Sequence, residues 1–297
     1  MRISSYCQAL LDDELTRFEQ DYQKHYLEGE TKAKEVGAPY LLHHADADKG
    51  VLLIHGLMAA PEEVRQWAEF LYTLGYNVYA PRMAGHGTSA DDLSDREMNE
   101  WIASVDRGHD ILACCSKHII IAGFSTGGAV ALHQAITKPQ AFDAVISISA
   151  PLKFKKFSAK FASLVNTWNQ TLRQVDALLP FQMNSVKTLR KEFVTNHADN
   201  PDINYLRCPV HGIVQIQRLM KAVCRGLPSI QIPSLIIHAT HDPKVDVQSA
   251  KEIFKRIRAR KKRYREVDFD KHGIVRGDIT KIVFQEVADF LEPEPIV

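Results

Sequence analysis

The stretch His118-Ile119-Ile120-Ile121-Ala122-Gly123-Phe124-Ser125-Thr126-Gly127-Gly128 decides the fold. It begins with an apolar run of the length of a buried strand and ends where a helix is predicted over residues 127–137. Between them, the pattern Gly-x-Ser-x-Gly places a serine on a sharp turn, and the flanking glycines lack the Cβ atoms that would obstruct it. Such a turn exposes the Oγ atom of Ser125 as a nucleophile. An ordinary glycine-rich turn is the alternative interpretation.

Short apolar strands alternate with amphipathic helices on both sides of this turn. Strands are predicted at residues 40–44, 51–55, 77–80, 118–122, 144–149, 234–238 and 263–268. Helices are predicted at residues 61–74, 98–115, 127–137, 247–258 and 279–291. The first two strands flank the turn-rich residues 46–50 and are expected to form a hairpin. The alternation predicts an α/β fold, with a mostly parallel central sheet flanked by helices on both faces.

Two segments lie outside this alternation. Residues 1–39 are expected to be an N-terminal helical extension whose amphipathic helix, over residues 10–26, docks on the main domain; a homodimer contact is its alternative role. Residues 152–207 are expected to be a helical cap insertion between two parts of the core, 40–151 and 208–297. Apolar side chains follow a helical spacing at Phe157, Phe161, Leu164, Trp168 and Leu172. They either line a ligand pocket at the carboxyl edge of the sheet or form only the insertion's own core.

The composition excludes several classes of protein. Of the 297 residues, 45% are hydrophobic and 25% are charged, as is typical of a folded globular protein. The formal net charge is +1, so we expect no general nucleic-acid binding, and the basic residues 256–265 are interpreted as solvated surface. The five cysteines form no CxxC pair. Neither a disulfide framework nor a metal site is therefore predicted, and no cofactor is implied.

No targeting or membrane-spanning segment is predicted. Residues 1–7 contain no apolar run of the signal-peptide type. Apolar runs such as residues 51–54 and 119–122 fall far short of the roughly 18 residues that cross a bilayer, so no stable membrane insertion is expected. Together with the cysteine pattern, these features favour a cytoplasmic location.

A second motif, His55-Gly56-Leu57-Met58, follows the predicted strand at 51–55. In this arrangement, the loop after the strand presents one backbone N–H group, and the residue after the nucleophile presents another. Those donors are Leu57 and Thr126, and together they would stabilise a developing oxyanion. His55 ends a buried strand, so we expect it to order the loop by hydrogen bonding rather than to act as a base.

Three motifs stand in a recognisable order: His55-Gly56-Leu57, the stretch from Tyr79 to Ser89 (YAPRMAGHGTS), and Gly123-Phe124-Ser125-Thr126-Gly127-Gly128. This order and spacing resembles the α/β-hydrolase superfamily, in particular its monoacylglycerol lipase and bacterial carboxylesterase group. The resemblance covers residues 40–150 and 230–295. Where that group commonly has Arg-Gly-His-Gly, this chain has Ala84-Gly85-His86-Gly87. The resemblance therefore supports the fold more strongly than a finer subfamily.

The superfamily places its catalytic residues in the order nucleophile, acid, base. The resemblance implies an acid after the strand at 234–238 and a histidine after the next strand. Asp242 occupies the acid position. Asp246 is the alternative acid, although it suits the start of the following helix better. His272 occupies the base position, in a glycine-containing loop.

These residues predict a serine hydrolase. His272 takes the proton of Ser125 as the serine attacks a carbonyl, and Asp242 orients the imidazole and stabilises its charged form. Water then hydrolyses the acyl-enzyme. The predicted substrate is a small-molecule carboxylic ester with a hydrophobic acyl group. A thioesterase, an amidase or an acyltransferase would use the same residues, whereas a catalytically silent interaction protein would share only the fold.

Overall fold

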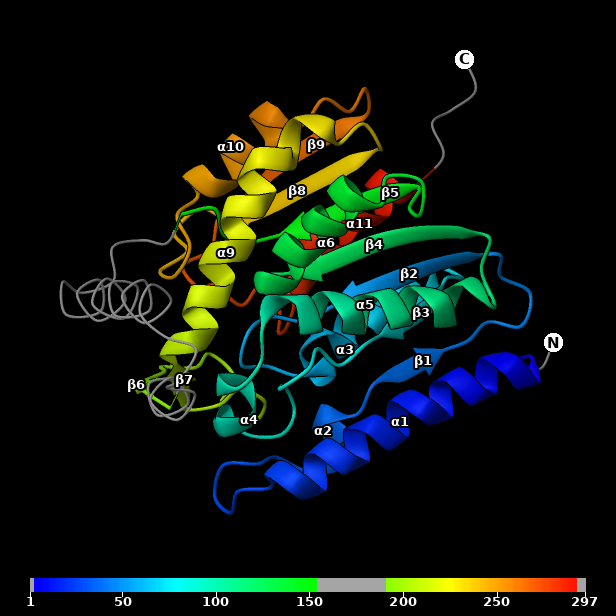
Figure 1. Ribbon diagram of the computed structural model, residues 1–297. Helices are drawn as coiled ribbons and strands as arrows, with labels where there is room; N and C mark the ends of the chain where they lie inside the picture. The colour runs from blue at the N-terminus through cyan, green and yellow to red at the C-terminus, as the bar shows by residue number, and fades with distance from the viewer. Residues whose placement is uncertain (1–2, 154–190, 293–297) are drawn as a thin grey trace, which may run out of the picture.

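A seven-stranded sheet forms the centre of the molecule in the computed structural model, which describes residues 3–153 and 191–292 (Figure 1). The strand order is β1-β3-β2-β4-β5-β8-β9, and each neighbouring pair is parallel except β1 with β3. The strands are β1 (Tyr40–Leu42), β2 (Lys49–Ile54), β3 (Asn77–Ala80), β4 (His118–Phe124), β5 (Ala144–Ile148), β8 (Ser234–Ala239) and β9 (Lys262–Val267). The predicted α/β fold is confirmed.

Helices cover both faces of this sheet (Figure 1). They are α3 (Arg65–Thr73) with its preceding 3-10 turn η1 (Pro61–Val64), α5 (Met98–Ala113), α6 (Thr126–Thr137), α9 (Val210–Gly226), α10 (Gln248–Arg256) and α11 (Thr280–Leu291). Alternate residues of β2 serve the two faces: Leu52 and Ile54 pack in the core with α5, α6 and α9, whereas Val51 and Leu53 pack with α3 and α11. Within the described residues, no helix combines the length and apolar character that a membrane crossing needs.

The predicted hairpin between residues 40–44 and 51–55 is wrong. β1 pairs with β3, and β3 lies between β1 and β2. β2 is almost wholly buried and takes two parallel neighbours, β3 and β4, whereas β1 stays at the edge. The side chain of Asn77 holds the segment between β1 and β2 in place. Its Oδ1 accepts from the N–H of His44 at 2.7 Å, and its Nδ2 donates to the carbonyl of Ala47 at 3.2 Å. The turn-rich residues therefore carry the chain past a strand.

Several elements lie outside the predicted set. α9 is amphipathic and packs against α6, so it belongs to the layer that covers the sheet. A short helix, α4 (Ala90–Ser94), follows the loop after β3. Near the end of the expected insertion, β6 (Phe193–Thr195) and β7 (Arg207–Pro209) form a two-stranded antiparallel sheet. The helical spacing from Phe157 to Leu172 lies outside the described residues, and the domain boundaries stay a prediction.

The N-terminal helix α1 (Ser5–His25) docks on the main domain, as predicted (Figure 1). Cys7 and Phe18 are buried in the contact. Asp21 binds two arginines of the main domain, with Oδ2 2.6 Å from Nη2 of Arg82 and Oδ1 3.2 Å from Nη2 of Arg96. Arg82 lies in the loop after β3 and Arg96 follows α4, so these ion pairs attach α1 to the segment that leads from β3 through α4.

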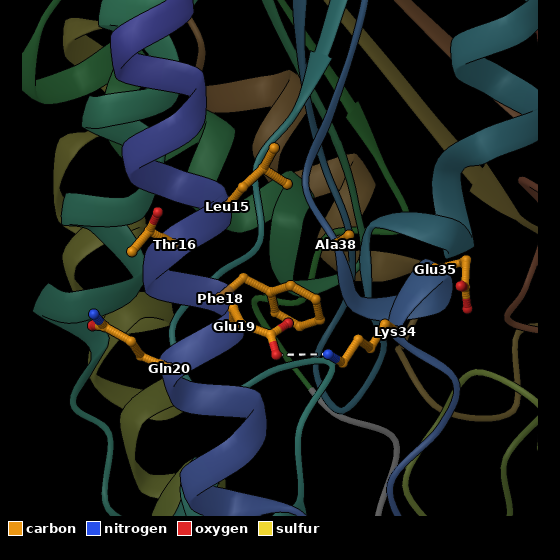
Figure 2. Close-up of a pocket in the computed structure, with 8 residues that line it drawn as sticks. All are labelled: Leu15, Thr16, Phe18, Glu19, Gln20, Lys34, Glu35 and Ala38. Atoms are coloured by element: carbon orange, nitrogen blue, oxygen red, sulfur yellow. Dashed lines mark hydrogen bonds and ion pairs between the residues drawn. The ribbon is translucent and has the colours of Figure 1, made fainter.

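A shallow groove of about 510 Å³ lies between α1 and the segment of α2 (Lys34–Gly37) (Figure 2). Its lining residues are Leu15, Thr16, Phe18, Glu19, Gln20, Lys34, Glu35 and Ala38. Glu19 and Lys34 form an ion pair of 2.6 Å across it. None of the predicted site residues lines this groove. The alternative role of α1, a homodimer contact, stays a prediction.

Candidate active site

The turn that carries Ser125 has strained backbone geometry. Ser125 joins β4 to α6 with φ 54° and ψ −120°, a region that residues with a side chain rarely adopt. A Cβ atom on Gly123 would lie 2.3 Å from the backbone of Gly127, and one on Gly127 would lie 2.2 Å from the carbonyl oxygen of Ile54. The N–H of Ser125 donates to the carbonyl of Ile148 at 2.8 Å. The glycines thus permit the sharp turn, as the sequence pattern predicts.

Three side chains far apart in the sequence form a hydrogen-bonded chain. Nε2 of His272 lies 2.8 Å from Oγ of Ser125, and Nδ1 of His272 lies 2.6 Å from Oδ2 of Asp242. Because a carboxylate only accepts, Nδ1 carries the proton and Nε2 accepts from the serine hydroxyl. His272 is 7% exposed and Asp242 is fully buried. The structure therefore brings together the three residues predicted as nucleophile, base and acid.

The surroundings of Asp242 favour its carboxylate form. Its Oδ1 accepts from the N–H groups of Lys244 and Val245 at 2.8 and 2.9 Å, while Oδ2 faces His272. Burial opposes ionisation, but the hydrogen bond and charge of His272, together with the two N–H groups, hold the pKa of Asp242 below its ordinary value. The ring of His238 also lies 3.4 Å from Oδ2. Asp242 is therefore a fixed negative charge behind His272.

Asp246, the alternative acid, serves the helix that follows it. Its Oδ1 accepts from the N–H of Gln248 at 2.9 Å, and its carbonyl accepts from the N–H of Ser249 at 2.8 Å. These are local contacts at the start of α10, of the kind expected for an aspartate that precedes a helix. Of the two candidate acids, the structure places Asp242 against His272.

The loop after β2 lies against Ser125, since a Cβ atom on Gly56 would lie 3.4 Å from the Cβ of Ser125. His55 shapes this loop with both ring nitrogens. Its Nε2 accepts from the N–H of Met83 at 3.2 Å, and its Nδ1 donates to the carbonyl of Gly56 at 2.8 Å. Burial lowers the pKa of His55 to about 4, so the ring is neutral. The predicted structural role of His55 is confirmed.

The two predicted oxyanion donors lie on the segments that meet at Ser125. Thr126 is the first residue of α6, so its N–H is one of the amide groups that a helix N-terminus leaves without an intrahelical partner. Leu57 directly follows Gly56. The next residue, Met58, adopts a left-handed backbone with φ 60° and turns the chain towards η1. The donor role of Leu57 and Thr126 belongs to the proposed mechanism.

Residues 191–207, the described part of the expected cap insertion, contact the loops of the candidate site at the carboxyl edge of the sheet. The N–H of Tyr205 donates to the carbonyl of Met58 at 3.0 Å. Asp199 accepts from the N–H of Gly273 at 3.2 Å and lies 3.4 Å from Nζ of Lys244. These contacts join the loop after β2 to the loops that carry Asp242 and His272. Asp199 and Tyr205 carry no sequence signal for this role, because it depends on how the chain returns from the insertion.

One cluster of side chains has the composition of a cation site. Ligand atoms of Asp21, His25 and Asp92 lie within 4.8 Å of one another. Both carboxylates are already paired with arginine: Asp21 with Arg82 and Arg96, and Asp92 with Arg96 at 2.7 Å. The positive charge that a cation would supply is therefore provided by guanidinium groups, and the cluster is an ion-pair network that attaches α1.

The sheet order, the strained turn and the hydrogen-bonded chain are those of an α/β hydrolase. A family model described as serine aminopeptidase, S33, matches residues 45–278, and the chain belongs to this family.

Sequence relatives are similar over most of their length. The thermostable monoacylglycerol lipase of Bacillus sp. (strain H-257) is 29% identical over 216 residues, which are 72% of this chain and 78% of the relative. The carboxylesterase of Bacillus subtilis (strain 168) is 24% identical over 246 residues, which are 82% of this chain and 93% of the relative.

Solved structures share the fold. A structure from work on two metagenome-derived lipolytic enzymes has a TM-score of 0.71 at 21% identity, covering 89% of this chain and 98% of the other. The monoacylglycerol lipase of Paleococcus ferrophilus has a TM-score of 0.67 at 19% identity, covering 85% and 98%. The predicted resemblance to the α/β-hydrolase superfamily is confirmed.

Proposed function

We propose that the protein is a serine hydrolase that cleaves carboxylic esters of a hydrophobic acyl group through an acyl-enzyme. The observation that carries this proposal is the hydrogen-bonded chain from Ser125 through His272 to Asp242, with contacts of 2.8 and 2.6 Å. A nucleophile, a base within hydrogen-bond reach and a buried acid that orients the base are the groups that acyl transfer needs. The strained turn at Ser125 supports the proposal, because strain of this kind concentrates at functional residues.

The proposed reaction has two halves. Nε2 of His272 takes the proton of Ser125 as Oγ bonds to the ester carbonyl carbon, and the N–H groups of Leu57 and Thr126 donate to the resulting oxyanion. When the tetrahedral intermediate collapses, the alcohol leaves with the proton from His272 and the acyl group stays on Ser125. Water, deprotonated by His272, then releases the carboxylic acid. Asp242 stays ionised throughout and stabilises the imidazolium.

Apolar side chains on the loop after β2 support a hydrophobic acyl group. Leu57 and Met58, on the loop that lies against Ser125, pack with buried Cys208 and Ile213. The relatives named monoacylglycerol lipase and carboxylesterase point to the same substrate class. We therefore propose a carboxylic ester rather than a peptide as the substrate.

The cytoplasmic location stays a prediction.

Hydrolysis of a short p-nitrophenyl ester tests this function. The wild type should release p-nitrophenol, and Ser125→Ala should lose on the order of 10⁶-fold in kcat, because a serine hydrolase without its nucleophile keeps only the rate enhancement from binding and the oxyanion donors. Ser229→Ala, which replaces an exposed serine that caps a turn, should behave as wild type. Turnover in the Ser125→Ala variant at the wild-type rate would contradict the assignment.

A further inference from the structure

Glu63 is a buried acid beside the candidate site that the proposed mechanism does not use. It lies in η1 and is 5% exposed. Its Oε2 accepts from the N–H of Gly56 at 2.6 Å. Its sequence neighbour Glu62 points elsewhere, towards Arg65 and Arg276. A hydrogen bond of 2.6 Å from a backbone amide to a buried carboxyl oxygen is short, so Glu63 restrains the loop after β2.

Gly56 is held between this carboxyl group and the serine. A Cβ atom on Gly56 would lie 3.0 Å from Oε2 of Glu63 and 3.4 Å from the Cβ of Ser125. No side chain therefore separates the loop backbone from either neighbour. A displacement of the Gly56 backbone away from Glu63 would change its distance from Ser125.

Both peptide planes that flank the Cα atom of Gly56 are fixed by hydrogen bonds. The plane before it carries the N–H that donates to Glu63. The plane after it carries the carbonyl that accepts from Nδ1 of His55 at 2.8 Å, and the same plane contains the N–H of Leu57. Because the C=O and N–H of a trans peptide point in opposite directions, fixing that carbonyl fixes the direction of the Leu57 N–H. Glu63 and His55 thus hold the two dihedral angles of Gly56 from its two sides.

Charged groups near the carboxyl group place it in the electrostatic field of the site. Burial raises the pKa of Glu63 to about 7, against the N–H of Gly56 and the positive charges of Lys244, Arg276 and, when it is protonated, His272, which favour ionisation. Burial therefore outweighs the groups that favour the carboxylate.

We propose that Glu63 is a positioning residue that holds Gly56 so that the N–H of Leu57 is directed at the oxyanion formed on Ser125. The inference rests on the proposed function and adds a residue to it. Glu63 does not touch the reacting atoms, and it acts through the backbone of one glycine. A glutamine at this position keeps an oxygen that accepts the Gly56 N–H, whereas an alanine does not.

Three variants test this role with a p-nitrophenyl ester. Glu63→Ala should lower kcat by about 10- to 100-fold with little change in KM, below the roughly 10²–10³-fold loss for a deleted oxyanion donor, because the donor is misdirected rather than removed. Glu63→Gln should stay within about threefold of wild type because its amide oxygen still accepts the hydrogen bond. Glu62→Gln, at the neighbouring acid, should match wild type. The melting temperature of each variant shows whether it is folded at the temperature of the assay.

A second readout separates this role from the proposed function. Hydrogen exchange of the Gly56 amide should be faster in Glu63→Ala than in wild type and should be slow again in Glu63→Gln. Wild-type kcat in folded Glu63→Ala, or unchanged exchange at Gly56, would overturn the positioning role. Absence of ester hydrolysis by the wild type would instead refute the proposed function, and the exchange of Gly56 would still decide whether Glu63 holds the loop.

Discussion

Asp242 and Asp246 are the same residue type on one loop, and backbone contacts give them different surroundings. The N–H groups of Lys244 and Val245 fix one carboxylate oxygen of Asp242, which leaves the other to His272. One carboxylate oxygen of Asp246 instead accepts from the N–H of Gln248 at the start of α10. The role of each side chain at this scale follows from the hydrogen bonds that the loop geometry allows.

Replacement of each aspartate by asparagine tests this difference. Asp242→Asn should lower kcat for a p-nitrophenyl ester by on the order of 10³–10⁴-fold, because the amide no longer selects the tautomer with Nδ1 protonated. Asp246→Asn should stay within about threefold of wild type, since its amide oxygen can still accept from Gln248. A large loss in Asp246→Asn with little change in Asp242→Asn would show that the acid is misassigned.

The strand-turn-helix context predicts Ser125, and the superfamily's order of nucleophile, acid and base predicts Asp242 and His272 after their strands. The parallel strands then bring the three loops to one edge of the sheet. Glu63 could not be predicted in this way. It stands next to Glu62 in the sequence, and nothing in the pattern distinguishes the two. Only the packing of η1 against the loop after β2 separates them. Glu63 is buried against Gly56, whereas Glu62 pairs with Arg276.

At the scale of the elements, glycines fix the close approach of β4, α6 and the end of β2. The Cβ atom of an alanine at Gly127 would lie 2.2 Å from the carbonyl oxygen of Ile54. A glycine in α9, Gly212, has ordinary space around it, since a Cβ atom there would meet Pro209 at 3.4 Å. Replacement of glycine by alanine should therefore destabilise the protein at Gly127 and stabilise it at Gly212.

Urea unfolding of two alanine variants measures these effects. Gly127→Ala should lower the free energy of unfolding by about 3 kcal/mol or more, because the backbone of the turn must move. Gly212→Ala should raise it by about 0.5–1 kcal/mol, because alanine loses less backbone entropy in a helix. Equal effects in both variants would be incompatible with the close contact at Gly127.

The boundaries of the elements could be predicted better than their pairing. The strands and helices of the core follow the periodicity of apolar residues, which is a local property of the chain. The partner of β1 depends on the burial of β2 between two parallel neighbours and on the side chain of Asn77, which are properties of the assembled sheet. The turn-rich residues 46–50 indicate a change of direction, but they carry no information about which strand comes next in space.

At the scale of the whole molecule, the near-zero net charge hides titratable groups that the fold buries. Burial raises the pKa of Glu63 to about 7 from an ordinary value of 4.5. As the pH rises from 4.5 to 7, the unfolded chain releases this proton while the folded chain keeps it. Because the folded state then binds more protons than the unfolded state, this group lowers the stability of the protein as the pH rises through this window.

The difference in stability between Glu63→Gln and wild type should therefore depend on pH. The glutamine variant should gain stability relative to wild type as the pH rises from 4.5 to 7, and the difference should be constant above that range. Urea unfolding at a series of pH values measures it. A difference that does not change between pH 4.5 and 7 would contradict the raised pKa of Glu63.

Direct detection of an acyl-enzyme tests the central claim most directly. The wild type would be mixed with a p-nitrophenyl ester, quenched in acid within milliseconds, digested and analysed by mass spectrometry, in parallel with Ser125→Ala. We predict that the mass of the acyl group, less one hydrogen, appears on the peptide that contains Ser125 and is absent from the variant. Ester hydrolysis by the wild type with the acyl group on another residue, or an identical adduct in Ser125→Ala, would contradict the account.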